Sequence, residues 1–256
     1  MLIREKLLKH KKQRIDVMMV ARGLAPSRQK ARDIIVNSNV AVNGIVVKKA
    51  GYLIEENARI DLESEILDYV SRGGLKLASA LNHFKEIDIK DKVCLDLGAS
   101  TGGFSDVLLQ RGAALIYAVD VGHSQLNKKI RTNPKVRNLE KINARDIDEN
   151  IIDTPPAIIV CDVSFISLQL ALPPALQLAS QKADLLALIK PQFEVGRNFI
   201  GKGGIVRDNI ARRRAESVIS DFLIEQGWLI KGTFIPALKG ADGNIEIVIA
   251  ASKCSI

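Results

Sequence analysis

From residue 92 onward, short apolar runs alternate with amphipathic stretches. The apolar runs are VCLDLG, LIYAVD, VRNLE, AIIVCD and DLLALIK, and stretches such as GGFSDVLLQRG and RRRAESVISDFLIEQG separate them. Strands that alternate with helices predict a parallel sheet covered by helices on both faces. Two further runs, WLIKGTFIPAL and NIEIVIAAS, flank residues 239–243 and predict an antiparallel hairpin. We therefore expect a doubly wound, Rossmann-like α/β domain over residues 76–256, closed by a C-terminal antiparallel hairpin.

The preceding part of the chain shows a different pattern, with two short amphipathic helices followed by strands. The first helical stretch is RIDVMMVAR, and Ser27 is a suitable N-cap for the second, RQKARDIIVNS. Asn43 and Gly44, between two β-branched runs, predict a tight hairpin. We expect a small α+β domain over residues 1–62, joined to the α/β domain by a linker at residues 63–75.

Charge is distributed unevenly between these two domains. The chain has a formal net charge of +8 at pH 7. Residues 1–62 contain 13 Lys and Arg against 6 Asp and Glu, whereas the rest of the chain contains 24 against 23. A basic module attached to a nearly neutral body indicates binding to a polyanion. Charge alone, however, fits a solvated basic surface equally well.

The composition excludes several classes of protein. No apolar run approaches the roughly 18 residues that a membrane span needs, and the charged start of the chain lacks the apolar core of a signal peptide. Cys94, Cys161 and Cys254 have no metal-ligand spacing. We therefore expect a cytoplasmic protein with reduced thiols, without a bound metal and without stable membrane association.

A glycine-rich turn, DLGASTGGFSD, follows the first strand of the α/β domain. It is neither G-x-G-x-x-G nor a P-loop, which favours a ligand without phosphate. Asp120, at the end of the next strand, suits two ribose hydroxyls, and Asp146 is placed to reach an adenine amino group. S-adenosylmethionine carries adenosine, a sulfonium and an amino-acid tail, and it fits this pattern. The candidate cofactor residues are Asp96, Gly98, Ser100, Gly102, Gly103, Phe104, Asp120 and Asp146.

Charged residues also occur where two later strands end. Asp162 ends IIVCD and Lys190 ends LLALIK, so both side chains are expected at the carboxyl edge of the sheet. Methyl transfer to a hydroxyl needs positioning and a group that takes the proton, for which a lysine in a dry site is suitable. A carboxylate close to Lys190 favours the ammonium form of its side chain, whereas a second lysine close to it favours the neutral amine. The sequence therefore leaves open whether Lys190 accepts the proton or holds the oxygen in line while water accepts it.

These features together resemble the FtsJ type of ribose 2′-O-methyltransferases, whose catalytic set is Lys-Asp-Lys-Glu in this chain order. The stretches SRGGLKL, DLGASTGGFSDVLLQRGA, VDVGHSQL, CDVSFISL, LIKPQFEVGR, KGGIVRD and GNIEI extend the resemblance, over nearly the whole chain, to the TlyA family, also named haemolysin A. The resemblance implies that Lys190 activates a ribose 2′-hydroxyl and that Asp162 orients it. The catalytic set that it implies is Lys76, Asp162, Lys190 and Glu246.

The N-terminal motifs RID, SRQKARDII and VAVNG resemble a small RNA-binding domain shared by a ribosomal small-subunit protein, pseudouridine synthases and tyrosyl-tRNA synthetases. Lys and Arg side chains suit phosphate contacts, which supply affinity but little sequence information. The resemblance to the TlyA family implies ribosomal subunits as partners, methylated on cytidine ribose in the small and, in some members, the large subunit. The implied RNA contacts are Arg14, Ser27, Arg28, Lys30, Lys48 and Lys49.

Other functions fit the sequence less well. Methylation of an exocyclic amine commonly uses an Asn/Asp-Pro-Pro-aromatic loop, where this chain has CDVSFI. Methylation at cytosine C5 needs a cysteine on a loop, but Cys161 lies inside a strand. A membrane-lytic protein, which the haemolysin name suggests, would depend on REKLLKHKKQR, a stretch with few apolar anchors. An RNA-binding factor without catalysis is disfavoured because the Lys-Asp-Lys-Glu set is intact.

Overall fold

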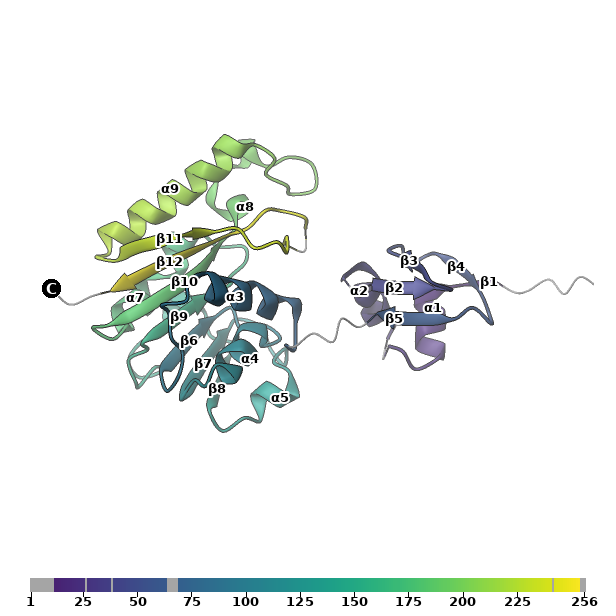
Figure 1. Ribbon diagram of the computed structural model, residues 1–256, viewed down its shortest axis with the longest axis horizontal. Coiled ribbons are helices and arrows are strands. Elements are labelled where there is room, and N and C mark those ends of the chain that lie inside the picture. Colours follow the sequence, from purple (N-terminus) through teal and green to yellow (C-terminus); the bar gives the residue numbers. More distant parts are fainter. Residues whose placement is uncertain (1–11, 26, 38, 64–68, 241, 254–256) are drawn as a thin grey trace, which may run out of the picture. The chain divides into compact units, whose positions relative to one another are not determined.

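The computed structural model describes residues 12–25, 27–37, 39–63, 69–240 and 242–253. The side chain of Lys30 and the whole of Cys254 lie outside this description. The chain divides into two compact units, residues 1–67 and 68–256, and both are drawn in Figure 1.

The N-terminal unit combines two helices with short antiparallel strands. Strands β3, β2 and β5 form one sheet in that order, and β1 pairs with β4. Asn43 and Gly44 have φ values of 50° and 81°, as a two-residue hairpin turn requires. The predicted helices and hairpin are thus confirmed. The elements are β1 (Lys12–Arg14), α1 (Ile15–Ala21), α2 (Arg28–Asn37), β2 (Asn39–Val42), β3 (Ile45–Val47), β4 (Leu53–Glu55) and β5 (Ile60–Glu63).

A small apolar core holds this unit together. Ile15, Met18 and Met19 are spaced three and four positions apart on α1, so they share one face of the helix and are buried together. Ile35 of α2 and Val40 of β2 pack into the same cluster. Three of the basic residues of this unit, Arg28, Lys30 and Arg32, belong to α2.

The second unit is built on a seven-stranded sheet, with strand order β11-β12-β10-β9-β6-β7-β8. β10, β9, β6, β7 and β8 pair in parallel, whereas β12 is antiparallel to both β10 and β11. The doubly wound fold and the C-terminal hairpin are therefore confirmed. The strands are β6 (Val93–Leu97), β7 (Leu115–Asp120), β8 (Val136–Glu140), β9 (Ile158–Cys161), β10 (Ala183–Ile189), β11 (Leu229–Phe234) and β12 (Ile247–Lys253).

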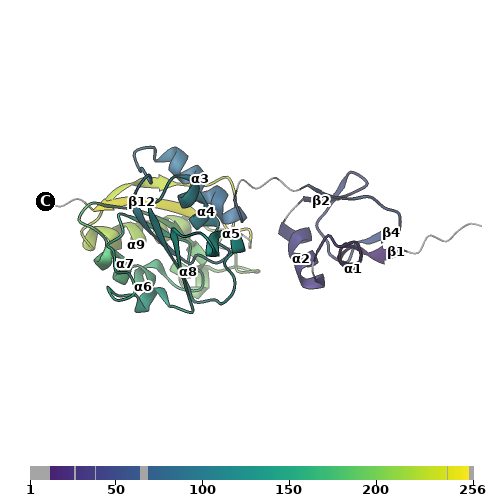
Figure 2. The same ribbon diagram turned by 90° about the horizontal axis from the view of Figure 1, so that it is seen from below.

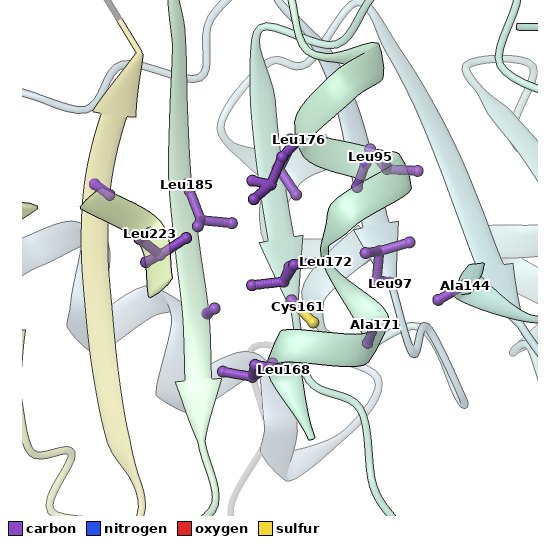
Figure 3. Packing of buried hydrophobic residues seen from close by; sticks show 14 of the residues in the cluster. Leu95, Leu97, Ala144, Cys161, Leu168, Ala171, Leu172, Leu176, Leu185 and Leu223 are labelled. Carbon is purple, nitrogen blue, oxygen red and sulfur yellow. The ribbon is translucent and has the colours of Figure 1, made fainter. Parts of the chain in front are cut away.

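Helices cover both faces of this sheet. Figure 2 shows α3 and α4 on one face and α6, α7 and α9 on the other. Each face has its own apolar cluster, as alternation along the buried strands requires. Figure 3 shows Leu172 and Leu176 packed over Cys161, Leu95 and Leu97 in one of them. The helices are α3 (Arg72–His83), α4 (Gly103–Gln110), α5 (Lys128–Arg131), α6 (Leu168–Ala171), α7 (Pro173–Leu178), α8 (Pro191–Glu194), α9 (Asn209–Glu225), η1 (Ala144–Asp146) and η2 (Arg197–Phe199).

Helix α3 differs from the sequence expectation in its position. It begins at Arg72, inside the stretch expected to be a linker, and continues to His83. Two adjacent glycines in SRGGLKL obscure the helical pattern there, because glycine is a weak helix former. Gly74 is nevertheless required for packing, since a Cβ at this position would lie 2.6 Å from Tyr69 Cβ and 2.9 Å from the Gly103 carbonyl oxygen. The close approach of α3 to α4 thus depends on that glycine.

Candidate active site

The carboxyl ends of neighbouring strands β6, β9 and β10 bring the first group of candidate residues together. The strand order reverses between β6 and β9, which is where doubly wound sheets bind ligands. Asp162 follows β9 and Lys190 follows β10, and Lys190 Nζ lies 2.6 Å from Asp162 Oδ1. Lys190 Nζ also donates a hydrogen bond of 2.9 Å to Ser164 Oγ. Lys190 is 8% exposed, so its amino group is held in a largely dry site.

A second ion pair joins the other two candidate catalytic residues. Lys76 on α3 and Glu246 just before β12 are both buried, and Lys76 Nζ lies 2.5 Å from Glu246 Oε2. The first turn of α3 also approaches Asp162, because a Cβ on Gly73 would lie 3.9 Å from Asp162 Oδ2. The fold therefore brings residues from four separate segments, up to 170 positions apart in the sequence, to one edge of the sheet.

A cavity of about 1070 Å³ opens beside this charged group. Its volume suits a nucleoside-sized ligand together with part of a second one. Phe165 and Phe193 form one part of its wall, with ring centroids 5.2 Å apart. The polar lining comes from the ends of several strands. The residues that line it include Gly98, Ser100, Asp120, Gln125, Asn143, Arg145, Asp162, Ser164, Phe165, Gln192, Phe193 and Arg197.

Three of the candidate cofactor residues line this cavity directly. Gly98 has a φ of 81°, and a Cβ there would lie 2.6 Å from the Asp162 carbonyl oxygen, so no other residue fits. The two oxygens of Asp120 accept hydrogen bonds from the backbone N–H groups of Ser100, at 2.8 Å, and Gly122, at 2.6 Å. These bonds fix the carboxylate but leave each oxygen a further lone pair for ligand hydroxyls.

Asp96 lies behind the glycine turn and is fully buried. Ser105 donates a hydrogen bond of 2.6 Å to its Oδ2, whereas Oδ1 has no hydrogen-bond partner within the described structure. Burial raises the pKa of Asp96 to about 7, and the charges of Asp162 and Asp120 act in the same direction, against the Ser105 hydrogen bond. A buried, unpartnered carboxylate oxygen favours a cationic ligand. This site therefore fits a cofactor with a sulfonium and an ammonium group.

The raised pKa of Asp96 predicts a specific pH dependence of stability. Between about pH 4 and pH 7 the folded protein retains a proton that the unfolded chain has released, so the free energy of unfolding falls as pH rises through this range. The slope is at most about 1.4 kcal/mol per pH unit. We expect Asp96→Asn to remove this decline. Guanidinium unfolding at a series of pH values, followed by the fluorescence of buried Trp228, measures it; equal slopes in the two proteins would contradict the assignment.

The remaining candidate cofactor residues lie in other surroundings. A Cβ on Gly102 would meet Leu126 at 2.9 Å, and one on Gly103 would meet Ser71 Oγ at 2.1 Å, so both glycines permit close packing around α4. Phe104 is buried in the core on that face of the sheet. Asp146 ends the short helix η1, whose preceding residues, from Asn143 to Arg145, line the cavity in its place.

Three residues of the site were not predicted from the sequence: Ser164, Phe165 and Gln192. Each follows a strand-end charge by two or three positions, in CDVSF and IKPQF. Phe165 is 90% exposed and has a φ of 66°, which is rare for an aromatic residue. Gln192 Oε1 is buried without a hydrogen-bond partner within the described residues. Only their position in the sequence could have indicated these residues. Side chains that shortly follow a parallel strand also lie at the edge of the sheet where ligands bind.

Three arginines of the N-terminal unit gather around one buried acid. Asp16 is fully buried and accepts hydrogen bonds from Arg14, at 3.0 Å, and from Arg28 and Arg32, both at 3.3 Å. The hydrogen bonds from Arg14 hold the pKa of Asp16 well below its usual range, and Arg32 and Arg28 add to this effect. The three guanidinium groups are about half exposed, so they present outward donors while their orientation is fixed.

The other predicted RNA contacts are less completely described. Ser27, Lys48 and Lys49 are exposed on the surface of the N-terminal unit. Lys30 belongs to α2, but its side chain is outside the described part of the chain. Arg32, which was not among the predicted RNA contacts, joins this basic group through Asp16.

Three features of the structure bear on the alternative functions. Among the residues that the structure describes, no cluster of His, Cys, Asp and Glu could hold a metal ion. Within the same residues, every helix is too short or too polar to cross a membrane. Cys161 is fully buried beneath the helices of one face, and burial raises the pKa of its thiol to about 12.

Known proteins resemble both units. A family model described as FtsJ-like methyltransferase matches residues 69–253, and the S4 domain model matches residues 13–60. The 16S/23S rRNA (cytidine-2′-O)-methyltransferase TlyA of Mycobacterium tuberculosis is 42% identical over 234 residues, which cover 91% of this chain and 87% of that protein. The 23S rRNA (cytidine-2′-O)-methyltransferase TlyA of Campylobacter jejuni is 37% identical over 247 residues, covering 89% and 94%.

Solved structures agree with these sequence relationships. A protein from Streptococcus thermophilus that carries the hemolysin name superposes with a TM-score of 0.75 at 38% identity, covering 96% of this chain and 90% of that one. Its fold thus extends over both units of the present chain. The chain therefore belongs to the TlyA/hemolysin A family of FtsJ-like methyltransferases that carry an S4 domain.

Proposed function

We propose that the chain methylates the ribose 2′-hydroxyl of cytidine in ribosomal RNA. The observation that carries this proposal is the pairing of Lys190 with Asp162 beside the cavity, with Lys76 and Glu246 paired at the same edge of the sheet. A lysine held by a carboxylate suits a hydroxyl acceptor, whereas an exocyclic amine or a ring carbon would need other groups. Relatives named as cytidine 2′-O-methyltransferases of rRNA share 37–42% of the sequence.

The methyl donor of this family is S-adenosylmethionine, which supplies a methyl group already activated by a sulfonium. We assign its ribose hydroxyls to Asp120, whose carboxylate is fixed by two backbone N–H groups. The unpartnered oxygen of Asp96 suits the cationic part of the molecule. Gly98 allows the backbone to approach the cofactor closely, and Ser100 lines the cavity beside it. Asp146 is assigned to the adenine amino group, and its neighbours Asn143 and Arg145 line the cavity.

In the proposed reaction the four charged residues have separate tasks. Lys190, as the neutral amine, takes the proton of the 2′-hydroxyl, and Asp162 stabilises the ammonium that forms. Lys76 and Glu246 are too deeply buried to be solvated freely, so their pairing fixes the wall against which the ribose is oriented. The low exposure of these side chains excludes water and strengthens each electrostatic contact.

The N-terminal unit supplies affinity for RNA in this proposal. Its exposed arginines, held by Asp16, together with Lys48 and Lys49, provide contacts to phosphate oxygens. Such contacts act with little regard to sequence, so the choice of nucleotide is left to the methyltransferase unit and to the shape of the ribosomal subunit.

Transfer of labelled methyl groups tests the proposal directly. The protein is incubated with labelled S-adenosylmethionine and isolated small or large ribosomal subunits, and the modified nucleotide is mapped. We expect label on the 2′-oxygen of a cytidine; label on a base, or none on either subunit, would overturn the proposal. A second experiment uses Lys48→Ala/Lys49→Ala. This variant should bind the subunit more weakly, and the slope of the logarithm of its binding constant against the logarithm of salt concentration should be smaller by roughly 2, while cofactor affinity stays unchanged.

A further inference from the structure

The contacts of Lys190 Nζ differ in kind. The approach to Asp162 Oδ1 is an ion pair of 2.6 Å, but that oxygen has no hydrogen-bond partner among the described residues. Within the same part of the chain, Lys190 Nζ donates a hydrogen bond of 2.9 Å to Ser164 Oγ. The attraction within an ion pair depends weakly on the orientation of the two groups, whereas a hydrogen bond requires the N–H to point at the acceptor. The serine hydroxyl is therefore the group that orients the amine.

The segment that carries Ser164 is held firmly against α8. Ser167 Oγ donates a hydrogen bond of 2.6 Å to Glu194 Oε2, and the Leu168 backbone N–H donates one of 2.9 Å to Glu194 Oε1. The ring contact between Phe165 and Phe193 joins the same two segments. The segments that follow β9 and β10 are thus joined by these contacts as well as by the ion pair between Asp162 and Lys190. This fixes Ser164 Oγ relative to the amine it contacts.

Ser164 also faces the space where the acceptor must enter. It is an exposed residue that lines the cavity, whereas Lys190 is 8% exposed. A neutral amine has two N–H groups and one lone pair. One N–H is donated to Ser164, and this bond leaves the lone pair for an incoming hydroxyl. The hydroxyl of Ser164 keeps its own proton, which is available to an oxygen of the ribose.

We propose that Ser164 is a positioning residue that directs the Lys190 amine toward the ribose 2′-hydroxyl; this rests on the proposed function. The reaction itself is unchanged. The O2′–H proton passes to Lys190 Nζ as the bond between O2′ and the methyl carbon forms. The bond between that carbon and sulfur breaks, and its electron pair stays on sulfur. Ser164 gains and loses no proton in this step, so its effect is on the orientation of the amine and hence on kcat.

The variant Ser164→Ala tests this assignment in the full-length protein. We expect kcat for subunit methylation to fall about tenfold, with KM for the subunit and Kd for S-adenosylmethionine within twofold of the wild type. Ser164→Thr, which keeps the hydroxyl, should recover most of the lost rate. Ser217→Ala, on the exposed face of α9, serves as a matched control with unchanged rate.

The outcomes separate this inference from the function on which it rests. If the wild-type protein transfers no methyl group to 2′-oxygen, the proposed function fails. If the wild type is active and Ser164→Ala has the same kcat, the positioning role is wrong. It is also wrong if Ser164→Ala both lowers kcat and raises KM for the subunit. A loss that threonine does not restore, accompanied by a lowered unfolding midpoint, would also overturn it, because it would indicate a structural role.

Discussion

Lys190→Ala is expected to lose methyl transfer by about 10²–10⁴-fold, the usual contribution of a positioned general base. Lys190 Nζ lies 2.6 Å from Asp162 Oδ1 and 2.9 Å from Ser164 Oγ at the end of β10, so alanine removes the amine to which the proton is assigned. Cofactor affinity should remain near the wild-type value because the cofactor is assigned to Asp120 and the glycine turn, whereas Lys190 acts on the acceptor. The labelled-transfer assay and calorimetric titration of S-adenosylmethionine measure the two quantities.

Two further variants make this test specific. Lys182→Ala removes an exposed lysine at the opposite end of the same strand and should leave the rate unchanged. Lys190→Arg keeps a cation but cannot accept a proton, so it should be nearly as inactive as the alanine variant. High activity of the arginine variant would contradict the role as base and would support the alternative in which Lys190 only holds the oxygen in line.

The sequence predicted those parts of the site that depend on strand order. Asp162 and Lys190 end apolar runs, and parallel strands place their carboxyl ends at one edge, so their proximity followed from the pattern. The pairing of Lys76 with Glu246 rested on family resemblance, because nothing in the local sequence indicates a contact across 170 positions. Contacts of that kind depend on how a helix and a distant strand pack.

The residues that the sequence missed share a different physical cause. Ser164 and Gln192 are ordinary polar residues in short loops, and their roles depend on loop conformation, which hydrophobic periodicity does not encode. The prediction for Gly102 and Gly103 stays open for a related reason. A glycine required for helix packing and a glycine required for ligand approach look alike in a sequence, and the two are distinguished only by the atoms that a Cβ would meet.

Glu246→Ala is expected to destabilise the methyltransferase unit by about 3–5 kcal/mol. Its carboxylate is the ion-pair partner of Lys76, and the two side chains are 4% and 10% exposed. Removal of one partner leaves an uncompensated buried ammonium, whose desolvation is no longer offset. Unfolding in guanidinium, followed by the fluorescence of Trp228 within the core of this unit, measures the loss. A change below about 1 kcal/mol would contradict the prediction.

The double variant Lys76→Met/Glu246→Leu separates stability from catalysis. Apolar side chains of similar volume remove both charges together, and such replacements are often neutral or stabilising, so most of the lost stability should return. If the ion pair also positions the ribose, this well-folded double variant should still fail to methylate ribosomal subunits. A stable and fully active double variant would show that the pair serves the fold alone, and it would reduce the catalytic set to Lys190, Asp162 and the serine that orients the amine.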